Sequence, residues 1–173
     1  MLNPFDLPCL NDTEFKQALG LIHNKAIKHS LTIATAESIT GGRVAAALTT
    51  LPGSSLYFRG GIVAYHIDAK EHLLRVRRHE AAACNCVSDR IANQMAFGAK
   101  EQFGADCIIA TTGYAEPWPA GGIPAPFAHY TVLCQGNIIA GRVPLDGLDR
   151  KGAQEAMTRS VVYVLAAMMN STL

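Results

Sequence analysis

The amino-acid sequence predicts an α/β fold, a three-layer α/β/α sandwich with a mixed, mostly parallel central sheet. Two observations predict it. Short, apolar, β-branched segments alternate along the chain with longer segments in which apolar residues recur at helical spacing. Toward the C-terminus two strand-like segments follow one another as in a hairpin, which adds an antiparallel pair to the sheet. The alternation places helices on both faces of the sheet.

The first predicted elements are a helix and a strand–helix unit. Asn11 and Glu14 have the spacing of a capping box, and the amphipathic pattern after them extends to about Lys28. Residues 31–36 form a short apolar strand, which passes through a polar turn into a helix over 43–48.

The middle of the chain repeats this arrangement. Residues 52–55 break the pattern, and a second strand is predicted over 61–65. It is followed by a helix that Asp68 could cap with Glu71 three residues on.

The second half of the chain completes the sandwich and contains one long loop with four prolines and three glycines. Such a loop is too long to be a mere connection, and long ordered loops usually serve a site. The predicted elements are a helix from Ser88 to Phe103, a strand over 108–112, the loop over 113–126, a hairpin of 127–134 with 138–143, and a closing helix over 150–169.

Length and composition limit the possible classes of protein. The 173 residues, 49% of them apolar, predict a single domain over 1–173 with an N-terminal extension over 1–11. The formal charge of +1 provides no broad basic surface, so we expect no nucleic-acid partner. No apolar run reaches the roughly 20 residues of a membrane span, and no signal segment begins the chain. We therefore expect no membrane partner and a cytoplasmic location.

Cysteine and histidine usage argues against disulfides and metals. Five cysteines are an odd number in a chain too large to need crosslinks, so reduced thiols are expected. Cys84 and Cys86 lack a second pair at zinc spacing, and the histidines are scattered. His66 and His72 do not share a helical face. We expect no metal site and no cofactor.

Three polar segments follow predicted strands, at 37–42, 65–70 and 111–113. Ligands of open α/β sheets bind at the carboxyl ends of strands, where helix N-termini present unpaired N–H groups. These segments contain more polar residues than a structural turn requires. The sequence therefore places a candidate site there.

Ser38 is the candidate nucleophile of this site. A serine in a strand-to-helix turn exposes its oxygen, and the N–H groups of Thr40, Gly41 and Gly42 could form an oxyanion hole. The alternative is that Ser38 or Thr40 only caps the following helix while the glycines allow tight packing. A G-x-S-x-G signature is absent.

Lys70 and Tyr65 are the candidate partners of Ser38. Lys70 falls in the first turn of a predicted helix, where the helix dipole and burial would lower its pKa and allow a serine–lysine pair. Tyr65 could orient these two groups or relay a proton between them. The alternatives are a solvated Lys70 on a helix face and a Tyr65 in the core.

Two further features remain open at this level. The basic run over 75–79 could meet a phosphate, but short charged runs usually form a solvated face. Trp118, inside the proline-rich loop, could stack on an aromatic ligand or fix the loop to the body of the protein.

A family resemblance is carried by motifs whose order and spacing cover about residues 12–170. The motifs are Ala34-Thr-Ala-Glu-Ser-Ile-Thr-Gly-Gly42, Pro52-Gly-Ser-Ser55, Phe58-Arg-Gly60, Val63-Ala-Tyr65, Asp68-Ala-Lys70 and Val87-Ser88. Together they resemble the C-terminal domain of CinA, the nicotinamide mononucleotide deamidase (PncC) family, in its stand-alone form.

This resemblance implies an α/β sandwich that hydrolyses the carboxamide of nicotinamide mononucleotide to nicotinate mononucleotide and ammonia. It implies Ser38 as nucleophile, Lys70 as general base and later acid, and Tyr65 as their helper. It also implies no metal, a small-molecule nucleotide as the partner, and a homodimer. Residues at positions that would line the ligand pocket are Glu37, Ser54, Ser55, Thr112, Gly113 and Arg150.

Three positions depart from the family pattern. Ile39 stands in place of a cysteine, Glu116 in place of a loop glycine, and Gln154 in place of the second arginine of the closing helix. Glu116 would repel an anionic ligand if it points inward, and the lost arginine would remove a bidentate contact. Two functions therefore stay open: an amidohydrolase, or a retuned or inactive paralogue that binds a nucleotide-like ligand or a protein partner.

Overall fold

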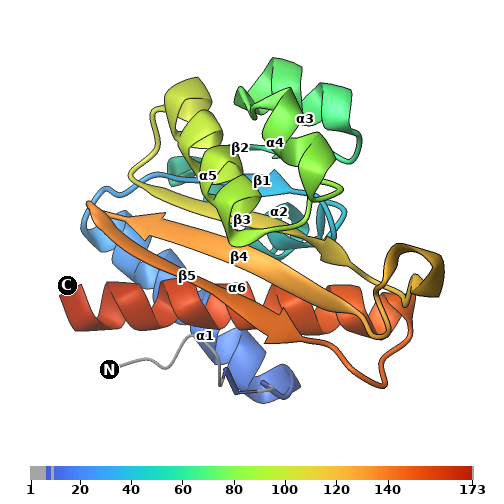
Figure 1. Cartoon of the computed structure of the whole chain (residues 1–173). Coiled ribbons are helices and arrows are strands. Elements are labelled where there is room, and N and C mark those ends of the chain that lie inside the picture. Colours follow the sequence, from blue (N-terminus) through green and yellow to red (C-terminus); the bar gives the residue numbers. More distant parts are fainter. Residues whose placement is uncertain (1–6, 9, 173) are drawn as a thin grey trace.

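The computed structural model describes residues 7, 8 and 10–172 and contains a five-stranded mixed sheet (Figure 1). The strands are β1 (Ile33–Glu37), β2 (Phe58–Val63), β3 (Cys107–Tyr114), β4 (Phe127–Cys134) and β5 (Asn137–Pro144), in the spatial order β2-β1-β3-β4-β5. β1 pairs parallel with β2 and with β3. β4 pairs antiparallel with β3 and with β5. The predicted mixed sheet with a parallel core is confirmed.

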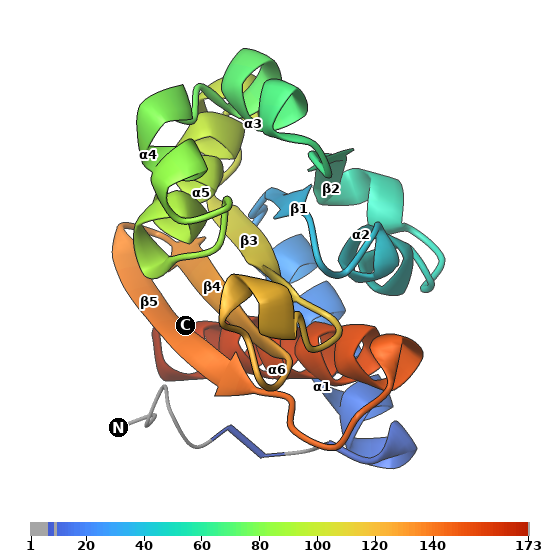
Figure 2. The ribbon, with the colours of Figure 1, turned by 45° about the vertical axis from the view of Figure 1, so that its right-hand side comes forward.

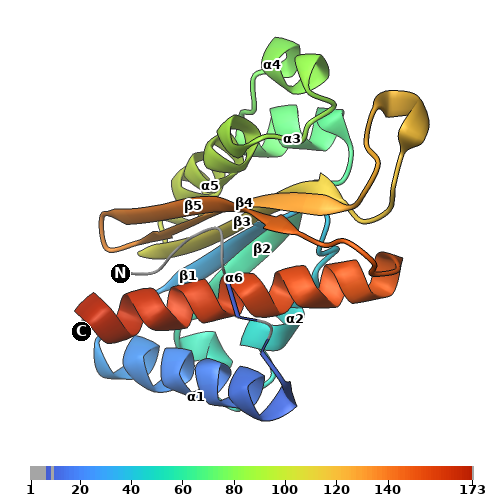
Figure 3. The ribbon, with the colours of Figure 1, turned by 60° about the horizontal axis from the view of Figure 1, so that its bottom comes forward.

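Helices cover both faces of this sheet, as the three-layer prediction requires (Figure 3). One layer contains α1 (Asp12–Lys28), α2 (Arg43–Leu48) and α6 (Arg150–Thr172), and the other contains α3 (Ile67–Leu74), α4 (Arg78–Ala83) and α5 (Asp89–Phe103). Two short 3₁₀ turns, η1 (Ser54–Leu56) and η2 (Pro119–Gly121), lie in connecting loops.

A separate apolar core lies on each side of the sheet. Ile33 and Ile109 belong to the core beneath α1 and α6, whereas Ala34 and Ile108 belong to the core beneath α5. β1 is buried at every position, including the polar Thr35 and Glu37, because helices cover both faces of the sheet. β5, at the edge, is exposed at its first residues.

Two of the predicted helix starts are confirmed in atomic detail. Asn11 accepts hydrogen bonds from the N–H groups of Thr13 and Glu14, and the Glu14 carboxylate accepts one from the N–H of Asn11, as in a capping box. Ser88 Oγ accepts from the Ile91 N–H at the start of α5.

The predicted cap of α3 is wrong by two residues. His66 is the N-cap, and its ring accepts a hydrogen bond from the Asp68 N–H. The Asp68 carboxylate instead binds Arg78. The basic run over 75–79 is neutralised by acidic neighbours in this way, which agrees with a solvated face rather than a phosphate site.

The expectation of reduced thiols is wrong for one pair. Cys107 and Cys134 lie directly opposite each other on β3 and β4 and form a disulfide. The pairing joins residues 27 positions apart, which cysteine spacing alone does not reveal. Cys84 and Cys86 are free thiols.

Only part of the predicted N-terminal extension is described. Residues 1–6 and Cys9 lie outside the described residues, while Leu7 and Leu10 pack against the body, and the Leu10 carbonyl accepts a hydrogen bond from Arg159. Within the described part of the chain, no helix combines the length and the apolar character that crossing a membrane requires.

Candidate active site

A pocket of about 530 Å³ lies at the carboxyl ends of β1 and β3, where the predicted polar segments meet. The residues that line it come from the turn after β1, the start of α3, α4 with the turn that follows it, the loop after β3, and the first residue of α6. Figure 2 shows how these segments are arranged around the sheet. Predicted site residues on its lining are Ser38, Tyr65, Lys70, Thr112, Gly113 and Arg150.

Ser38 and Lys70 are in direct contact inside this pocket. Lys70 Nζ lies 2.9 Å from Ser38 Oγ and donates a second hydrogen bond to the Ala64 carbonyl at 2.6 Å. Lys70 is 1% exposed and Ser38 is 8% exposed. The alternative of a solvated lysine is therefore wrong, because the Lys70 side chain is buried and its amine binds Ser38 and the Ala64 carbonyl.

Burial changes the protonation of Lys70. Removal of the ammonium from water lowers the pKa of Lys70, and the nearby Cys86 thiol acts in the opposite direction to a smaller extent. Burial likewise raises the pKa of Cys86. A neutral lysine amine has a lone pair that can accept the Ser38 proton, with one N–H still bound to the Ala64 carbonyl.

The turn that carries Ser38 is built on two glycines and a buried carboxylate. Gly41 and Gly42 have φ of 59° and 92°, a left-handed conformation that favours glycine. The Glu37 carboxylate accepts hydrogen bonds from the N–H groups of Gly42, Val44 and Ala45. Glu37 thus caps α2, a role that the alternative assigned to Ser38 or Thr40.

Glu37 is fully buried and does not line the pocket, so the expected contact with a ligand is not what the structure shows. Its carboxylate also accepts a hydrogen bond from the Thr40 hydroxyl at 2.7 Å, and the Thr40 and Thr111 hydroxyls share another at 2.9 Å. These contacts fix the turn after β1 from below. Glu37 therefore positions Ser38 through the backbone.

Hydrogen bonds inside the turn reduce the number of N–H groups that are free to form the expected oxyanion hole. The Gly41 N–H donates to the Ser38 carbonyl, and the Gly42 N–H donates to Glu37. Among residues 7, 8 and 10–172 the Thr40 N–H has no hydrogen-bond acceptor. Of the three expected donors, Thr40 is thus the one with a free N–H group.

Tyr65 lies at the rim of the pocket, apart from the serine–lysine pair. Its side chain is exposed, at 61%, so the alternative of a core tyrosine is wrong. Its hydroxyl accepts a hydrogen bond from Arg150 Nη1 at 3.2 Å. Arg150 also binds the Glu116 carboxylate. The structure joins Tyr65 to Arg150 and Glu116 rather than to Ser38 or Lys70.

Two residues of β3 shape the floor of the pocket. The Thr112 hydroxyl donates to the Cys86 carbonyl at 2.7 Å and thereby fixes the turn after α4. A side chain at Gly113 would overlap the backbone of Phe127 and Ala128 on β4, so close strand pairing requires the glycine.

Two expected pocket residues lie elsewhere. Ser54 and Ser55 form η1, between α2 and β2, and do not line this pocket. Gln154, which replaces the arginine of the family pattern, is buried near Gly41 and does not line it either.

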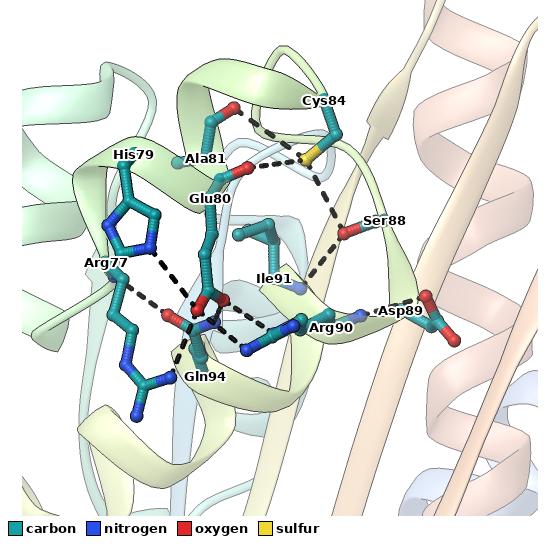
Figure 4. Close-up of polar contacts among 10 residues, drawn as sticks. All are labelled: Arg77, His79, Glu80, Ala81, Cys84, Ser88, Asp89, Arg90, Ile91 and Gln94. Carbon is teal, nitrogen blue, oxygen red and sulfur yellow. Dashed lines mark hydrogen bonds and ion pairs between the residues drawn. The ribbon is translucent and has the colours of Figure 1, made fainter.

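The wall formed by α4 was missed in the sequence, because only six residues form the helix and its apolar side is three alanines. Figure 4 shows how Glu80 fixes this wall to α5: its carboxylate binds Arg77, Arg90 and Gln94. Desolvation acts to raise the pKa of Glu80, but the hydrogen bonds from Arg77 and Gln94 and the charges of Arg90 and Arg77 together outweigh it and lower the pKa. The carboxylate is thereby kept charged.

Aromatic side chains line the loop side of the pocket. Trp118 is 45% exposed, and its ring lies 6.2 Å from that of Tyr114, which in turn packs edge-on against Phe127. Trp118 and Tyr114 both line the pocket. The tryptophan thus contacts the body of the protein through Tyr114 and is at the same time a partly exposed residue of the pocket lining.

A family model described as the CinA C-terminal domain matches residues 16–169, which include all the segments that enclose the pocket. The chain belongs to the CinA C-terminal domain family. Its resemblance to that family, stated from the motifs, is thus confirmed.

Solved structures of the family share this fold over nearly their whole length. The competence damage-inducible protein A (ComA) from Klebsiella pneumoniae superposes with a TM-score of 0.85 at 26% identity, over 92% of this chain and 99% of that one. The competence/damage inducible protein CihA from Agrobacterium tumefaciens gives a TM-score of 0.84 at 29% identity, over 98% and 99%.

Sequence relatives of the CinA family include longer proteins. A CinA-like protein from Chlorobium limicola is 44% identical over 111 residues, which are 64% of this chain and 25% of that protein. Protein MG115 from Mycoplasma genitalium is 45% identical over 96 residues, which are 56% of this chain and 61% of that protein. The match thus spans about a quarter of the first and three fifths of the second.

Proposed function

We propose that this CinA-family domain is an amidohydrolase that cleaves a carboxamide through a covalent intermediate on Ser38. The observation that carries the proposal is the buried contact of Lys70 Nζ with Ser38 Oγ at 2.9 Å, at the base of an open pocket. Burial of a lysine ammonium is unfavourable unless hydrogen bonds or an opposite charge compensate for the water it loses, or the amine loses its proton. Here the buried amine faces a serine oxygen that a substrate can reach.

The first half of the reaction forms an acyl-enzyme. Neutral Lys70 accepts the Ser38 proton while Oγ bonds to the carbonyl carbon of the amide, and the carbonyl electron pair moves onto oxygen. The Thr40 N–H is a candidate donor to that oxygen. The Lys70 ammonium then protonates the amide nitrogen, the C–N bond breaks, and ammonia leaves.

The second half returns the enzyme to its starting state. A water molecule loses a proton to Lys70 and attacks the ester carbonyl carbon, and Ser38 Oγ leaves with the proton that Lys70 returns. The carboxylic acid ionises on release. The net reaction consumes one amide and one water and yields a carboxylate and an ammonium ion.

The pocket supports a carboxamide on a flat ring as the substrate. Tyr65, Tyr114 and Trp118 offer aromatic faces on its lining, and the resemblance to the deamidase family implies a nicotinamide compound. We include nicotinamide mononucleotide as the first compound to test.

The direct test is ammonia release from nicotinamide mononucleotide by the purified protein, with Ser38→Ala as the matched control. The proposal expects release by the wild-type protein and at least a 10³-fold slower rate in the variant, as an order of magnitude for removal of a nucleophile. Circular dichroism checks that the variant is folded. A Ser38→Ala protein that keeps its activity contradicts the mechanism. A folded wild-type protein that binds the compound but releases no ammonia is better described as a binder without turnover.

A further inference from the structure

We infer that Glu116 is a specificity-determining residue, which makes the pocket prefer carboxamides without a phosphate over phosphorylated ones. The inference rests on the proposed amidohydrolase function and adds the class of substrate. It begins with the loop after β3, whose Glu116 side chain lines the pocket and binds Arg150, the first residue of α6, at its exposed side.

The arginine at the mouth is already occupied. Arg150 donates to Glu116 Oε2 from Nε at 2.9 Å and from Nη2 at 2.5 Å, and Nη1 donates to the Tyr65 hydroxyl at 3.2 Å. All three guanidinium nitrogens thus have an acceptor within the protein. Glu116 takes the Nε–Nη2 edge, one of the two edges through which an arginine binds a phosphate, and Tyr65 occupies one nitrogen of the other edge.

Few other positive charges line the pocket. Lys70 lies at its base, bound to Ser38 with its pKa lowered by burial, and His66 faces the Asp68 carboxylate at 3.1 Å. Among the described residues of the lining, Arg150 is therefore the permanently charged cation. The Glu116 carboxylate offsets its positive charge. A phosphate at the mouth would have to displace one carboxylate and then remain beside it, which is unfavourable for both anions.

The remaining lining is suited to a ring that is neutral or positively charged. Tyr65 and Trp118 present exposed aromatic faces, and aromatic faces attract cations as well as flat rings. The Glu116–Arg150 pair is itself about half exposed, so we expect it to add little to folding stability. Its effect is expected on the choice of ligand.

Nicotinamide riboside and nicotinamide mononucleotide provide a matched pair of probes, because they differ by the phosphate alone. We expect wild-type kcat/KM to be higher for the riboside. Glu116→Gln should raise kcat/KM for the mononucleotide about tenfold, because Arg150 is released to bind the phosphate. For the riboside the same substitution should change kcat/KM by less than about twofold.

Glu155→Gln is the matched control. Glu155 is also an exposed carboxylate, lies on α6 near Lys151, and does not line the pocket. The Glu155→Gln substitution removes the same charge from the protein as Glu116→Gln. It should leave the ratio of kcat/KM for the riboside to kcat/KM for the mononucleotide unchanged. A wild-type preference for the mononucleotide, or a ratio that Glu116→Gln does not move, overturns the inference while hydrolysis itself stands.

Failure of the proposed function gives a different result. If neither compound releases ammonia, titration calorimetry of both compounds with the wild-type and Glu116→Gln proteins decides the inference separately. Tighter binding of the riboside by the wild-type protein, reversed or reduced by Glu116→Gln, supports the role of Glu116 in a protein that only binds. Equal affinities for the two compounds, or binding of neither, overturn it.

Discussion

Lys70 Nζ lies 2.9 Å from Ser38 Oγ although 32 residues separate them in the chain. The serine comes from the turn after β1 and the lysine from the first turn of α3, on the two neighbouring parallel strand–helix units of the sheet. Parallel strands bring their carboxyl ends to the same edge, and this places the two side chains together. The contact makes the pair one chemical unit.

Replacement of Lys70 should abolish turnover. Lys70→Met keeps most of the apolar stem, and we expect kcat/KM to fall by about 10²- to 10⁴-fold, the range for loss of a general base. Lys70→Arg should be as inactive, because guanidinium does not lose its proton.

Wild-type kcat/KM should rise with pH through an inflection below the ordinary lysine pKa of 10.5, since burial lowers the pKa of Lys70. An inflection at or above 10.5 would count against the role of Lys70.

The same lysine should make stability depend on pH. Because the pKa of Lys70 is lower in the folded state than in the unfolded chain, the unfolded chain binds more protons between the two values. The free energy of unfolding of the wild-type protein, relative to Lys70→Met, should therefore rise with pH from the folded-state pKa up to about 10.5. Urea unfolding of both proteins at several pH values measures this difference. A difference that falls with pH would contradict a buried amine with a lowered pKa.

Tyr65→Phe separates two roles for this tyrosine. The hydroxyl accepts a hydrogen bond from Arg150 and contacts neither Ser38 nor Lys70. We therefore expect KM to rise by a few-fold and kcat to change less, with the pH inflection unchanged, because a single exposed hydrogen bond from the Arg150 guanidinium contributes about 1 kcal/mol. Steady-state kinetics across pH is the measurement. A large loss of kcat with a displaced inflection would instead indicate proton relay.

Glu37→Ala should destabilise the fold and the site together. The substitution leaves the N–H groups of Gly42, Val44 and Ala45 without their buried acceptor. We expect a loss of about 3 kcal/mol of unfolding free energy, and lower activity because Ser38 is on the same turn. Denaturant unfolding measures the loss. If stability were unchanged, Glu37 would not be the cap of α2.

Two glycine-to-alanine substitutions should change the free energy of unfolding in opposite directions. Gly98 lies in α5, where an added Cβ would overlap the carbonyl of Leu74 at the end of α3, so Gly98→Ala should cost about 2 kcal/mol. Gly20 lies in α1 with open space around it, so Gly20→Ala should stabilise by about 0.5–1 kcal/mol through helix propensity. Melting temperatures of the two variants test the pair. A Gly98→Ala protein that is more stable than the wild type would show that α3 and α5 do not pack as described.

The order of elements was predictable because each signal is local. A few consecutive residues are enough to identify the capping box at Asn11 and Glu14, the cap at Ser88 and the buried strand over 33–37. The short helix over 78–83 was not predicted, since six residues with three alanines give no clear amphipathic pattern. The cap of α3 at His66 was missed because Asp68 matched a stronger local rule.

The candidate site was predictable in part. Ser38, Lys70, Thr112, Gly113 and Arg150 were chosen from strand ends or motifs, and they meet in one pocket. Ser54 and Ser55 do not line this pocket. No local pattern distinguishes a serine that points into a pocket from one in a neighbouring 3₁₀ turn.

By itself the sequence determined the sandwich, its strand–helix order and the family, because periodicity, caps and motif spacing are properties of neighbouring residues. The tertiary structure decided that Lys70 is buried against Ser38, that Glu37 caps a helix, and that Glu116 binds Arg150. Burial and partners depend on which distant segments pack together, and this changes pKa and charge in ways that residue type does not specify. The same packing paired Cys107 with Cys134 across two strands.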